Sequence, residues 1–381
     1  MRGLHFSHWQ RALLSFFLTV CLPSCNCQRG NAIIIDSADS ANVDLLDLGT
    51  GTQLIPIPSE YDMGDITYAK VTGEYYFFFD EARKSIHIMD NRGEFQEFNR
   101  LGRGAGEYLD IGAFSFDKEK NELVIYERST RCLKFYSLSD YSKTRERQLD
   151  YYINAFECIS GDELLVFREN WKSYSSAVVR IDLETGSEET LLPLRADQIL
   201  ILEDYALSKS EDDGIYFGIT GEKMTFYRYG EDLQILSSLE FRPTKLSRNY
   251  WEGDFSEKKE KELLRILQKP EIELAMAPCA ISAVDGDISF WYAIRPSKTA
   301  HQLPEMRCCV MRSGQIALFK RIGCRDLGID SLQPIASHGK QTLTLLDAEL
   351  LSPRKGTELG DKFISLKQKG YNRFVLAYGL F

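Results

Sequence analysis

The sequence predicts an all-β fold, a six-bladed β-propeller whose blades are antiparallel sheets of four strands. Three observations point to it. The 381 residues include 19 tyrosines and 22 phenylalanines but only 11 prolines, a balance that favours strands. Short apolar strand cores recur six times, each directly after a turn-forming sequence, and their first residues lie 48, 41, 51, 73 and 55 positions apart. This spacing is close to the ~40–50 residues of one propeller blade.

The six cores are interpreted as the second strand of each blade. They are Tyr75–Phe79, Leu123–Tyr126, Leu164–Phe167, Ile215–Phe217, Ile288–Tyr292 and Leu343–Leu346. An apolar segment stands before the turn that leads into a core, so each pair is expected to form a hairpin. Third strands are expected at Ser85–Met89, Cys132–Tyr136, Ala177–Ile181, Met224–Tyr229, Cys308–Met311 and Phe374–Tyr378. Fourth strands follow after further turns and complete the blades.

The sixth unit ends one strand short, because the sequence stops at Phe381 just after the third strand. The missing outer strand is expected from the N-terminal side, where Gln53–Pro58 is a short apolar stretch whose prolines suit an edge position. Closure by both ends of the chain predicts one domain, residues 43–381. The widest gap between cores holds residues 254–268, which are predicted to form a short helical insertion that Pro270 ends.

The first 24 residues have the layout of a bacterial export signal. Two arginines accompany the apolar run Ala12–Leu22, which is shorter than the ~20 apolar residues that span a bilayer. Leu22-Pro-Ser-Cys25 is similar to the lipobox of bacterial lipoproteins, whose cysteine becomes the lipidated N-terminus. We therefore expect residues 1–24 to be removed as a signal peptide, Cys25 to carry lipid and residues 25–42 to form a flexible tether.

Two alternatives to this predicted processing stay open. Cys27 is a second, poorer lipobox cysteine, and an ordinary secretory signal could be cut near Ser24 or Gln28. The preferred interpretation places the protein in the bacterial cell envelope, as an outer-membrane lipoprotein that faces either the periplasm or the outside. The lipid anchor is then its only expected contact with the membrane.

Composition excludes several classes of function. The chain has 46 basic and 56 acidic residues, a net charge of −10, so it repels nucleic acid and anionic membranes as general partners. Hydrophobic residues make up 44% of the sequence, which is typical of a packed globule rather than a disordered chain. Seven cysteines remain besides Cys21 and Cys25. Their number is odd and no C-x-x-C occurs, so we expect small buried apolar residues rather than disulfides or a metal site.

The segment Leu101-Gly-Arg-Gly-Ala-Gly-Glu-Tyr108 stands between the expected strands Ser85–Met89 and Ile111–Phe116 and resembles the blade junction of NHL-type repeats. More closely, the chain is similar to the six-bladed β-propeller lipoproteins of Bacteroidota, in which such a segment links the first and second blades. The resemblance extends over most of the mature chain, and only residues 101–108 match in detail. It implies a fold and a location rather than an activity.

The motifs that could carry chemistry have plainer explanations. Gly102, Gly104 and Gly106 suggest a phosphate-binding loop, but a strand follows where such a loop needs a helix. They are interpreted as a turn that Arg103 and Glu107 tie down. The mature chain has three histidines, His87, His301 and His338, without metal-ligand or triad spacing, so no metal and no cofactor are expected. Scattered carboxylates leave an enzyme open as an alternative.

One face of the predicted ring collects aromatic and basic residues. The connections between second and third strands, and those from one blade to the next, share this face and are longer than the turns on the other. The candidate ligand-binding residues on it are Arg103, Tyr108, Trp171, Tyr174, Trp251 and Arg295. Long loops also collect such residues without any function, and that explanation is weighed equally.

Three functions compete at this point. The first is a non-catalytic, lipid-anchored module that binds a glycan or an envelope protein, for which arginine and aromatic side chains are suited. The second is a propeller enzyme, a lyase or hydrolase with its site at the channel mouth. The third is a structural platform for a membrane complex. No ligand identity or oligomeric state follows from the sequence.

Overall fold

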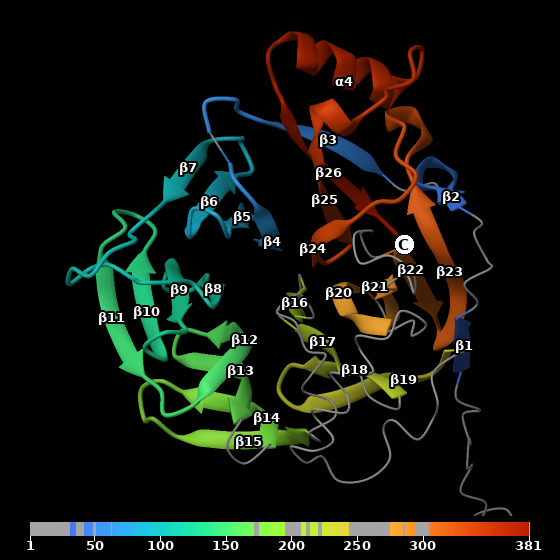
Figure 1. Cartoon of the computed structure of the whole chain (residues 1–381). Coiled ribbons are helices and arrows are strands. Elements are labelled where there is room, and N and C mark those ends of the chain that lie inside the picture. Colours follow the sequence, from blue (N-terminus) through green and yellow to red (C-terminus); the bar gives the residue numbers. More distant parts are fainter. Residues whose placement is uncertain are drawn as a thin grey trace, which may run out of the picture.

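The computed structural model describes residues 31–35, 42–48, 51–61, 63–170, 175–194, 207–210, 214–219, 223–243, 275–284, 286–294 and 305–380. Six sheets stand around a central axis and form a closed ring (Figure 1). Each sheet contains four antiparallel strands. In five sheets these strands follow one another in the sequence, whereas the outer strand of the sixth sheet comes from the N-terminal part of the chain. The chain is therefore a six-bladed β-propeller, as the spacing of the strand cores predicts.

The first three blades follow one another without interruption, and their strands run from the channel outward. Blade 1 consists of β4 (Ile66–Val71), β5 (Tyr75–Asp80), β6 (Ser85–Asp90) and β7 (Phe95–Phe98). Blade 2 consists of β8 (Ala113–Asp117), β9 (Glu122–Glu127), β10 (Cys132–Ser137) and β11 (Lys143–Gln148). Blade 3 consists of β12 (Tyr152–Ser160), β13 (Glu163–Asn170), β14 (Ser175–Asp182) and β15 (Glu188–Leu194).

The last three blades each take up a strand from the N-terminal part of the chain. Blade 4 consists of β16 (Leu207–Lys209), β17 (Ile215–Ile219), β18 (Lys223–Tyr229) and β19 (Leu233–Pro243), with β1 (Asn31–Ile35) outside. Blade 5 consists of β20 (Ala275–Val284), β21 (Asp287–Ile294), β22 (Glu305–Arg312) and β23 (Gln315–Gly323), with β2 (Asn42–Asp44) outside. Blade 6 consists of β24 (Pro334–His338), β25 (Gln341–Asp347), β26 (Arg373–Gly379) and β3 (Thr52–Ile57).

The closure of the ring is the predicted one. Strand β3 pairs antiparallel with β26, with Leu54 opposite Leu376 and Ile57 opposite Arg373. Both leucines are almost fully buried. The outer strand of the last blade therefore precedes the first blade in the sequence, which joins the two ends of the propeller.

The segment expected to be a flexible tether is partly ordered against the ring. Within residues 25–42, β1 pairs in parallel with β19, and β2 begins at Asn42 and pairs in parallel with β23. Both add a fifth strand to a blade, and Figure 1 shows them on the outer rim. A parallel strand added to an outer edge forms hydrogen bonds with N–H and C=O groups of that edge that would otherwise be unpaired. This pairing accounts for the position of Ala32–Ile35.

The connection from β25 to β26 contains an α-helix, α4 (Glu358–Gln368). Thr357 caps it by accepting a hydrogen bond from the backbone of Gly360 at 3.3 Å. Phe363 packs on Phe374 of β26 with ring centroids 5.0 Å apart. The helix expected at residues 254–268 lies outside the described residues, and none of the described helices is long and apolar enough to span a membrane.

The hydrophobic core lies mainly between neighbouring blades. Phe77 of blade 1, for example, faces Phe116 of blade 2 with ring centroids 5.3 Å apart, and both rings belong to one buried cluster. Five described cysteines are buried and free: Cys132, Cys158, Cys308, Cys309 and Cys324. Their placement agrees with the expected role as small core residues.

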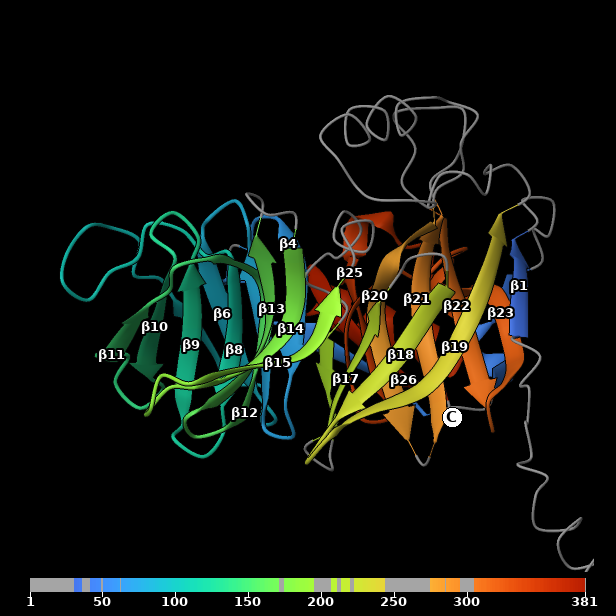
Figure 2. The ribbon, with the colours of Figure 1, turned by 90° about the horizontal axis from the view of Figure 1, so that it is seen from below.

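The alternation of strand direction gives the ring two different ends (Figure 2). We call the end with the turns between first and second and between third and fourth strands the hairpin end. The other end carries the connections between second and third strands and between blades, and we call it the crossover end. Residues 72–74 and 118–121 lie at the hairpin end, whereas residues 81–84 and 99–112 lie at the crossover end.

Candidate functional site

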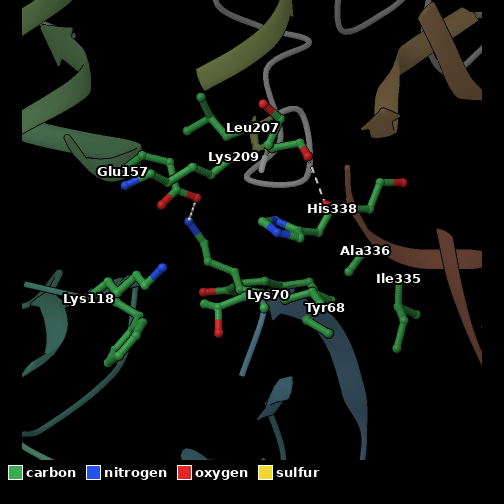
Figure 3. Close-up of a pocket in the computed structure, with 17 residues that line it drawn as sticks. Tyr68, Lys70, Lys118, Glu157, Leu207, Lys209, Ile335, Ala336 and His338 are labelled. Carbon is green, nitrogen blue, oxygen red and sulfur yellow. Dashed lines mark hydrogen bonds and ion pairs between the residues drawn. The ribbon is translucent and has the colours of Figure 1, made fainter. Parts of the chain in front are cut away.

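A cavity of about 240 Å³ opens in the central channel toward the hairpin end (Figure 3). Its walls come from the innermost strands of blades 1, 2, 3, 4 and 6 and from the turns that follow them. The lining residues are Tyr68, Ala69, Lys70, Val71, Thr72, Gly73, Phe116, Lys118, Glu157, Leu207, Ser208, Lys209, Ser210, Ile335, Ala336, Ser337 and His338. Five blades contribute, so the cavity exists only in the closed ring.

Three lysines give the cavity a positive wall. Lys70 comes from β4, Lys118 from the turn after β8 and Lys209 from β16. The ammonium of Lys209 donates to the backbone carbonyls of Cys158 at 3.2 Å and Ile159 at 3.3 Å. Lys118 is exposed, and its ammonium has no hydrogen bond or ion pair to the part of the chain that the structure describes.

Among the described residues of the lining, Glu157 is the single carboxylate, and both of its oxygens are engaged. Oε1 forms an ion pair with Lys70, which also donates to the carbonyl of Phe156 at 3.1 Å. Oε2 accepts a hydrogen bond from Ser115 at 2.6 Å. Ser115 in turn accepts from the backbone of Cys158 at 3.1 Å. These contacts connect blades 1, 2 and 3 around one buried charge.

Opposite the charged wall, blade 6 offers a more neutral one. Ile335 and Ala336 supply apolar surface, and the His338 ring borders the cavity (Figure 3). The hydroxyl of Ser208 donates to the carbonyl of Ser337 at 2.7 Å, which links blade 4 directly to blade 6. The cavity thus has a cationic side and a largely apolar side.

The part of the lining that the structure describes carries three ammonium groups against one carboxylate, in a protein whose net charge is −10. Such a local reversal of charge concentrates anions. Lysine ammoniums reach a ligand as flexible point charges, whereas arginine binds carboxylates through a rigid fork. In the part of the chain that is described, no group of three His, Cys, Asp or Glu side chains could hold a metal ion.

Neither of the two predicted ligand residues that the structure describes, Arg103 and Tyr108, lines this cavity. Arg103 is exposed at the crossover end. Tyr108 is fully buried, and its hydroxyl donates to the carbonyl of Lys84 at 2.8 Å and accepts from the backbone of Arg100 at 3.2 Å. Its ring therefore belongs to the core and offers no surface for stacking. The other four predicted residues, Trp171, Tyr174, Trp251 and Arg295, lie outside the described residues.

The glycine-rich segment is a braced turn, in agreement with the structural interpretation. The carboxylate of Glu107 accepts a hydrogen bond from the backbone of Gly104 at 2.5 Å. A Cβ at Gly102 would lie 2.0 Å from that carboxylate, so any other residue there would force the Glu107 side chain out of its position. Glu107 rather than Arg103 holds the turn.

Sequence reasoning missed the lysines of the channel, although one signal was present. Lys70 and Glu157 interrupt otherwise apolar inner strands, Ile66–Val71 and Tyr152–Ser160. A charged residue in the middle of an inner strand must either face the channel or find a partner. This pattern, applied to first strands, would have pointed to the channel.

Comparison with solved structures shows the same fold. A "Putative exported protein" from Bacteroides fragilis matches with a TM-score of 0.61 at 13% identity, over 91% of this chain and 99% of that one. A DUF4221 family member from Bacteroides vulgatus matches with a TM-score of 0.49 at 11% identity, over 86% and 95%. A catalytically inactive virginiamycin B lyase from Staphylococcus aureus matches with a TM-score of 0.41 at 13% identity, over 87% and 100%. These identities speak for the fold alone.

The search among curated proteins found no match. Residues 25–244, more than half of the chain, match the family DUF5128, whose description is 6-bladed beta-propeller. The matched region includes the first four blades and the four charged channel residues described above, Lys70, Lys118, Glu157 and Lys209. The chain belongs to the DUF5128 family of six-bladed β-propellers.

Proposed function

We propose that the chain is a non-catalytic binding module of the bacterial cell envelope that holds a small organic anion in its central channel. The observation that carries this proposal is the excess of ammonium groups among the described lining residues, three lysines against one carboxylate, around a cavity of about 240 Å³. Lys118 forms no hydrogen bond or ion pair with the described residues, and an anionic ligand would supply it with a charged acceptor.

The shape of the cavity limits the ligand. Typical small-molecule pockets measure ~300–1,000 Å³, so this one suits a molecule of about the size of a monosaccharide. The anionic group would lie near Lys118 and Lys209, and the remainder would contact Leu207 and Ile335. An acidic sugar meets both requirements, which narrows the expected glycan to its smallest acidic unit.

The state of Glu157 favours binding over catalysis. A general base needs a carboxylate that can accept a proton from the substrate. Glu157 already accepts from Ser115 and pairs with Lys70, so its role is to position the inner strands and one of the lysines. The lyase or hydrolase alternative would require Lys118, Lys209 or His338 to act without a free carboxylate among the described lining residues.

The envelope location rests on the sequence. A short apolar run followed by Leu22-Pro-Ser-Cys25 supports export and lipidation at Cys25. Mass spectrometry of the purified mature chain should find acyl groups on Cys25, and a Cys25→Ala variant should no longer partition into detergent. A wild-type chain without acyl mass would contradict the anchor and leave the pocket proposal intact.

Calorimetry can test the ligand class directly. Glucuronate, galacturonate and glucose 6-phosphate should raise the melting temperature, because a ligand of the folded state stabilises it by mass action, whereas neutral glucose should not. Lys118→Gln should weaken the binding about tenfold, or ~1.4 kcal/mol, without changing the melting temperature of the free protein. Lys118 makes no described contact that the substitution would break.

The matched control is Lys355→Gln, because Lys355 is an equally exposed lysine in the crossover connection before α4. It should bind every anion as the wild type does. Equal affinity for glucose and glucuronate, or the same loss in both lysine variants, would contradict an anion site in the channel.

A further inference from the structure

The crossover end carries a cluster of exposed apolar side chains on blades 1 to 3. Leu101, Leu109 and Tyr152 are 50%, 41% and 43% exposed. The described residues include only three other large apolar side chains of this exposure, and these are scattered over Leu46, Ile235 and Leu350. Clustered exposed apolar residues mark interaction sites, whereas single ones are ordinary.

Hydrogen bonds and a ring contact connect Leu109 with the turn of Arg128 and Arg131 and with Tyr152, and Leu101 and Arg103 lie in the same loop as Leu109. The loop 99–112 folds over the turn between β9 and β10. There the backbone of Leu109 donates to Glu127 at 2.7 Å, and Asp110 accepts from the backbone of Arg128 at 2.7 Å. Across that turn, the Arg131 guanidinium lies 5.7 Å from the centre of the Tyr152 ring. We call Leu101, Arg103, Leu109, Arg128, Arg131 and Tyr152 the arginine–leucine surface.

The charge of this surface is positive. Arg103 and Arg128 are exposed, and Arg131 is half-buried against Tyr152. The nearest carboxylates serve the fold. Asp110 accepts from backbone N–H groups of the turn, and Glu127 pairs with Lys134 at 2.7 Å. Arg103 and Arg128 therefore face solvent as donors in a protein that is otherwise acidic, whereas the Arg131 guanidinium donates to the carbonyl of Asp150 at 3.1 Å.

The frame beneath the surface is rigid. Glu107 braces the glycine-rich turn, and buried Tyr108 fixes the loop to the carbonyl of Lys84. A Cβ at Gly112 would lie 2.9 Å from the Cβ of Arg128, so the loop presses directly on the neighbouring turn. Exposed side chains on a fixed backbone lose little entropy when they bind, which is the condition for a preorganised interface.

From these observations we infer that the arginine–leucine surface docks an acidic protein segment that also carries apolar side chains. Arginine and tyrosine are the residue types that contribute most to protein interfaces. The arginines require acidic groups in the partner. Burial of the two leucines favours binding only when they contact apolar groups of the partner. An acidic glycan would satisfy the arginines but not Leu101 and Leu109. The charge complementarity therefore selects a polypeptide.

The net charge of the chain also influences the orientation in which an acidic partner binds. An acidic protein partner is repelled by most of a protein of net charge −10 and attracted by this surface, which favours one orientation on the ring. This site lies on the opposite end from the channel cavity and is independent of the small ligand proposed there.

Site-specific photocrosslinking in the native host tests the inference. A photoreactive amino acid replaces Leu109 in one variant and Leu350 in a matched control, because Leu350 is an exposed leucine of the crossover end on blade 6. The Leu109 position should give a discrete protein adduct whose crosslinked peptide contains Asp or Glu beside apolar residues. The double substitution Arg103→Glu and Arg128→Glu should reduce that adduct at least fivefold while the melting temperature stays unchanged.

Several results would overturn the inference. They are identical adducts from both positions, a crosslinked peptide that is basic or a glycan at Leu109, and an adduct that survives the charge reversal. A charge-reversed variant that melts early is replaced by Arg103→Gln with Arg128→Gln, for which a partial reduction of the adduct is expected. The absence of any adduct at Leu109 also contradicts the inference.

Discussion

The two ends of the ring present positive charge in different ways. At the hairpin end, Lys118 and Lys209 surround a cavity, and their ammoniums lie at the tips of flexible side chains. At the crossover end, Arg103 and Arg128 stand on loops that backbone hydrogen bonds to Glu107 and Asp110 hold in place. A flexible ammonium adapts to a small anion, whereas a guanidinium on a fixed frame presents a surface. The difference indicates a small ligand at one end and a macromolecule at the other.

The carboxylates that support these ends also differ. At the crossover end, burial alone would raise the pKa of Asp80, but backbone N–H groups of Gly64 and Arg83 together with His87 hold that pKa below its ordinary value. At the hairpin end, burial raises the pKa of Asp117 above its ordinary value, against the backbone N–H groups of Lys120 and Glu119. Ionised carboxylates therefore stabilise one end and cost stability at the other.

Opening the ring should destabilise both of its ends at once, and this is the largest loss of stability that we expect. Leu54 of β3 is 1% exposed and pairs with Leu376 across the closure. Leu54→Asp buries a charge without a partner, which costs at least ~4 kcal/mol. Urea unfolding should show one cooperative transition at a much lower midpoint. A variant that keeps the wild-type midpoint would show that β3 does not close the ring.

Breaking the support of the crossover end should have the next largest effect. Asp80 accepts hydrogen bonds from the backbones of Gly64 at 2.5 Å and Arg83 at 3.1 Å, and His87 Nε2 lies 3.3 Å from its carboxylate. Asp80→Asn removes the charge that strengthens these bonds, and we expect a loss of about 2–3 kcal/mol at pH 7.

The pH dependence of this loss follows from the lowered pKa of Asp80. A carboxyl with a lowered folded-state pKa contributes stability above its unfolded value of ~3.9, and this contribution disappears as the pH falls through the folded value. Wild type and Asp80→Asn should therefore differ most near neutral pH and converge below about pH 4. A difference that is constant with pH would assign the loss to packing alone.

The fold could be predicted from the sequence because its signals are local. Each hairpin core follows its own turn, and the apolar stretch at Gln53–Pro58 matches the strand missing from blade 6. The strands β1 and β2 escaped prediction because they pair in parallel with edges more than 200 residues away, without a turn to announce them. Helix α4 had signals in Thr357 and Gly370 that the search for strands did not use.

The candidate site could be predicted only in part, for a similar reason. Lys70 and Glu157 lie 87 residues apart and meet only because three blades curve around one channel. The sequence led instead to long loops, and Tyr108 shows the weakness of that choice. A tyrosine beside glycines and arginine looks exposed, but Tyr108 is the residue that fastens its loop to blade 1. The apolar neighbours Leu101 and Leu109 are the exposed ones.

Substituting the two tyrosines of the crossover end one at a time should have a smaller effect on stability. Burial raises the pKa of Tyr108 to about 12, so its hydroxyl stays protonated and donates to Lys84 throughout the physiological range. Tyr108→Phe leaves that carbonyl and the Arg100 backbone without a partner and should cost about 1–2 kcal/mol. Tyr152→Phe, the matched control on the exposed surface, should change stability by less than ~0.5 kcal/mol. Equal losses in urea unfolding would contradict the distinction between a core and a surface tyrosine.

The smallest effect should have the opposite sign, and it lies at the hairpin end. Both backbone hydrogen bonds to Asp117, from Glu119 at 3.0 Å and Lys120 at 3.1 Å, go to the same oxygen, Oδ1, which an asparagine amide can replace. Because the folded-state pKa of Asp117 is raised, its ionisation costs stability as the pH rises above the unfolded value. Asp117→Asn should therefore melt slightly higher than the wild type at pH 7. Near pH 4, where the wild-type carboxyl is increasingly protonated, this gain should shrink. A variant that melts lower than the wild type at pH 7 would mean that the carboxylate stabilises the hairpin end, and the contrast with Asp80 would then fail.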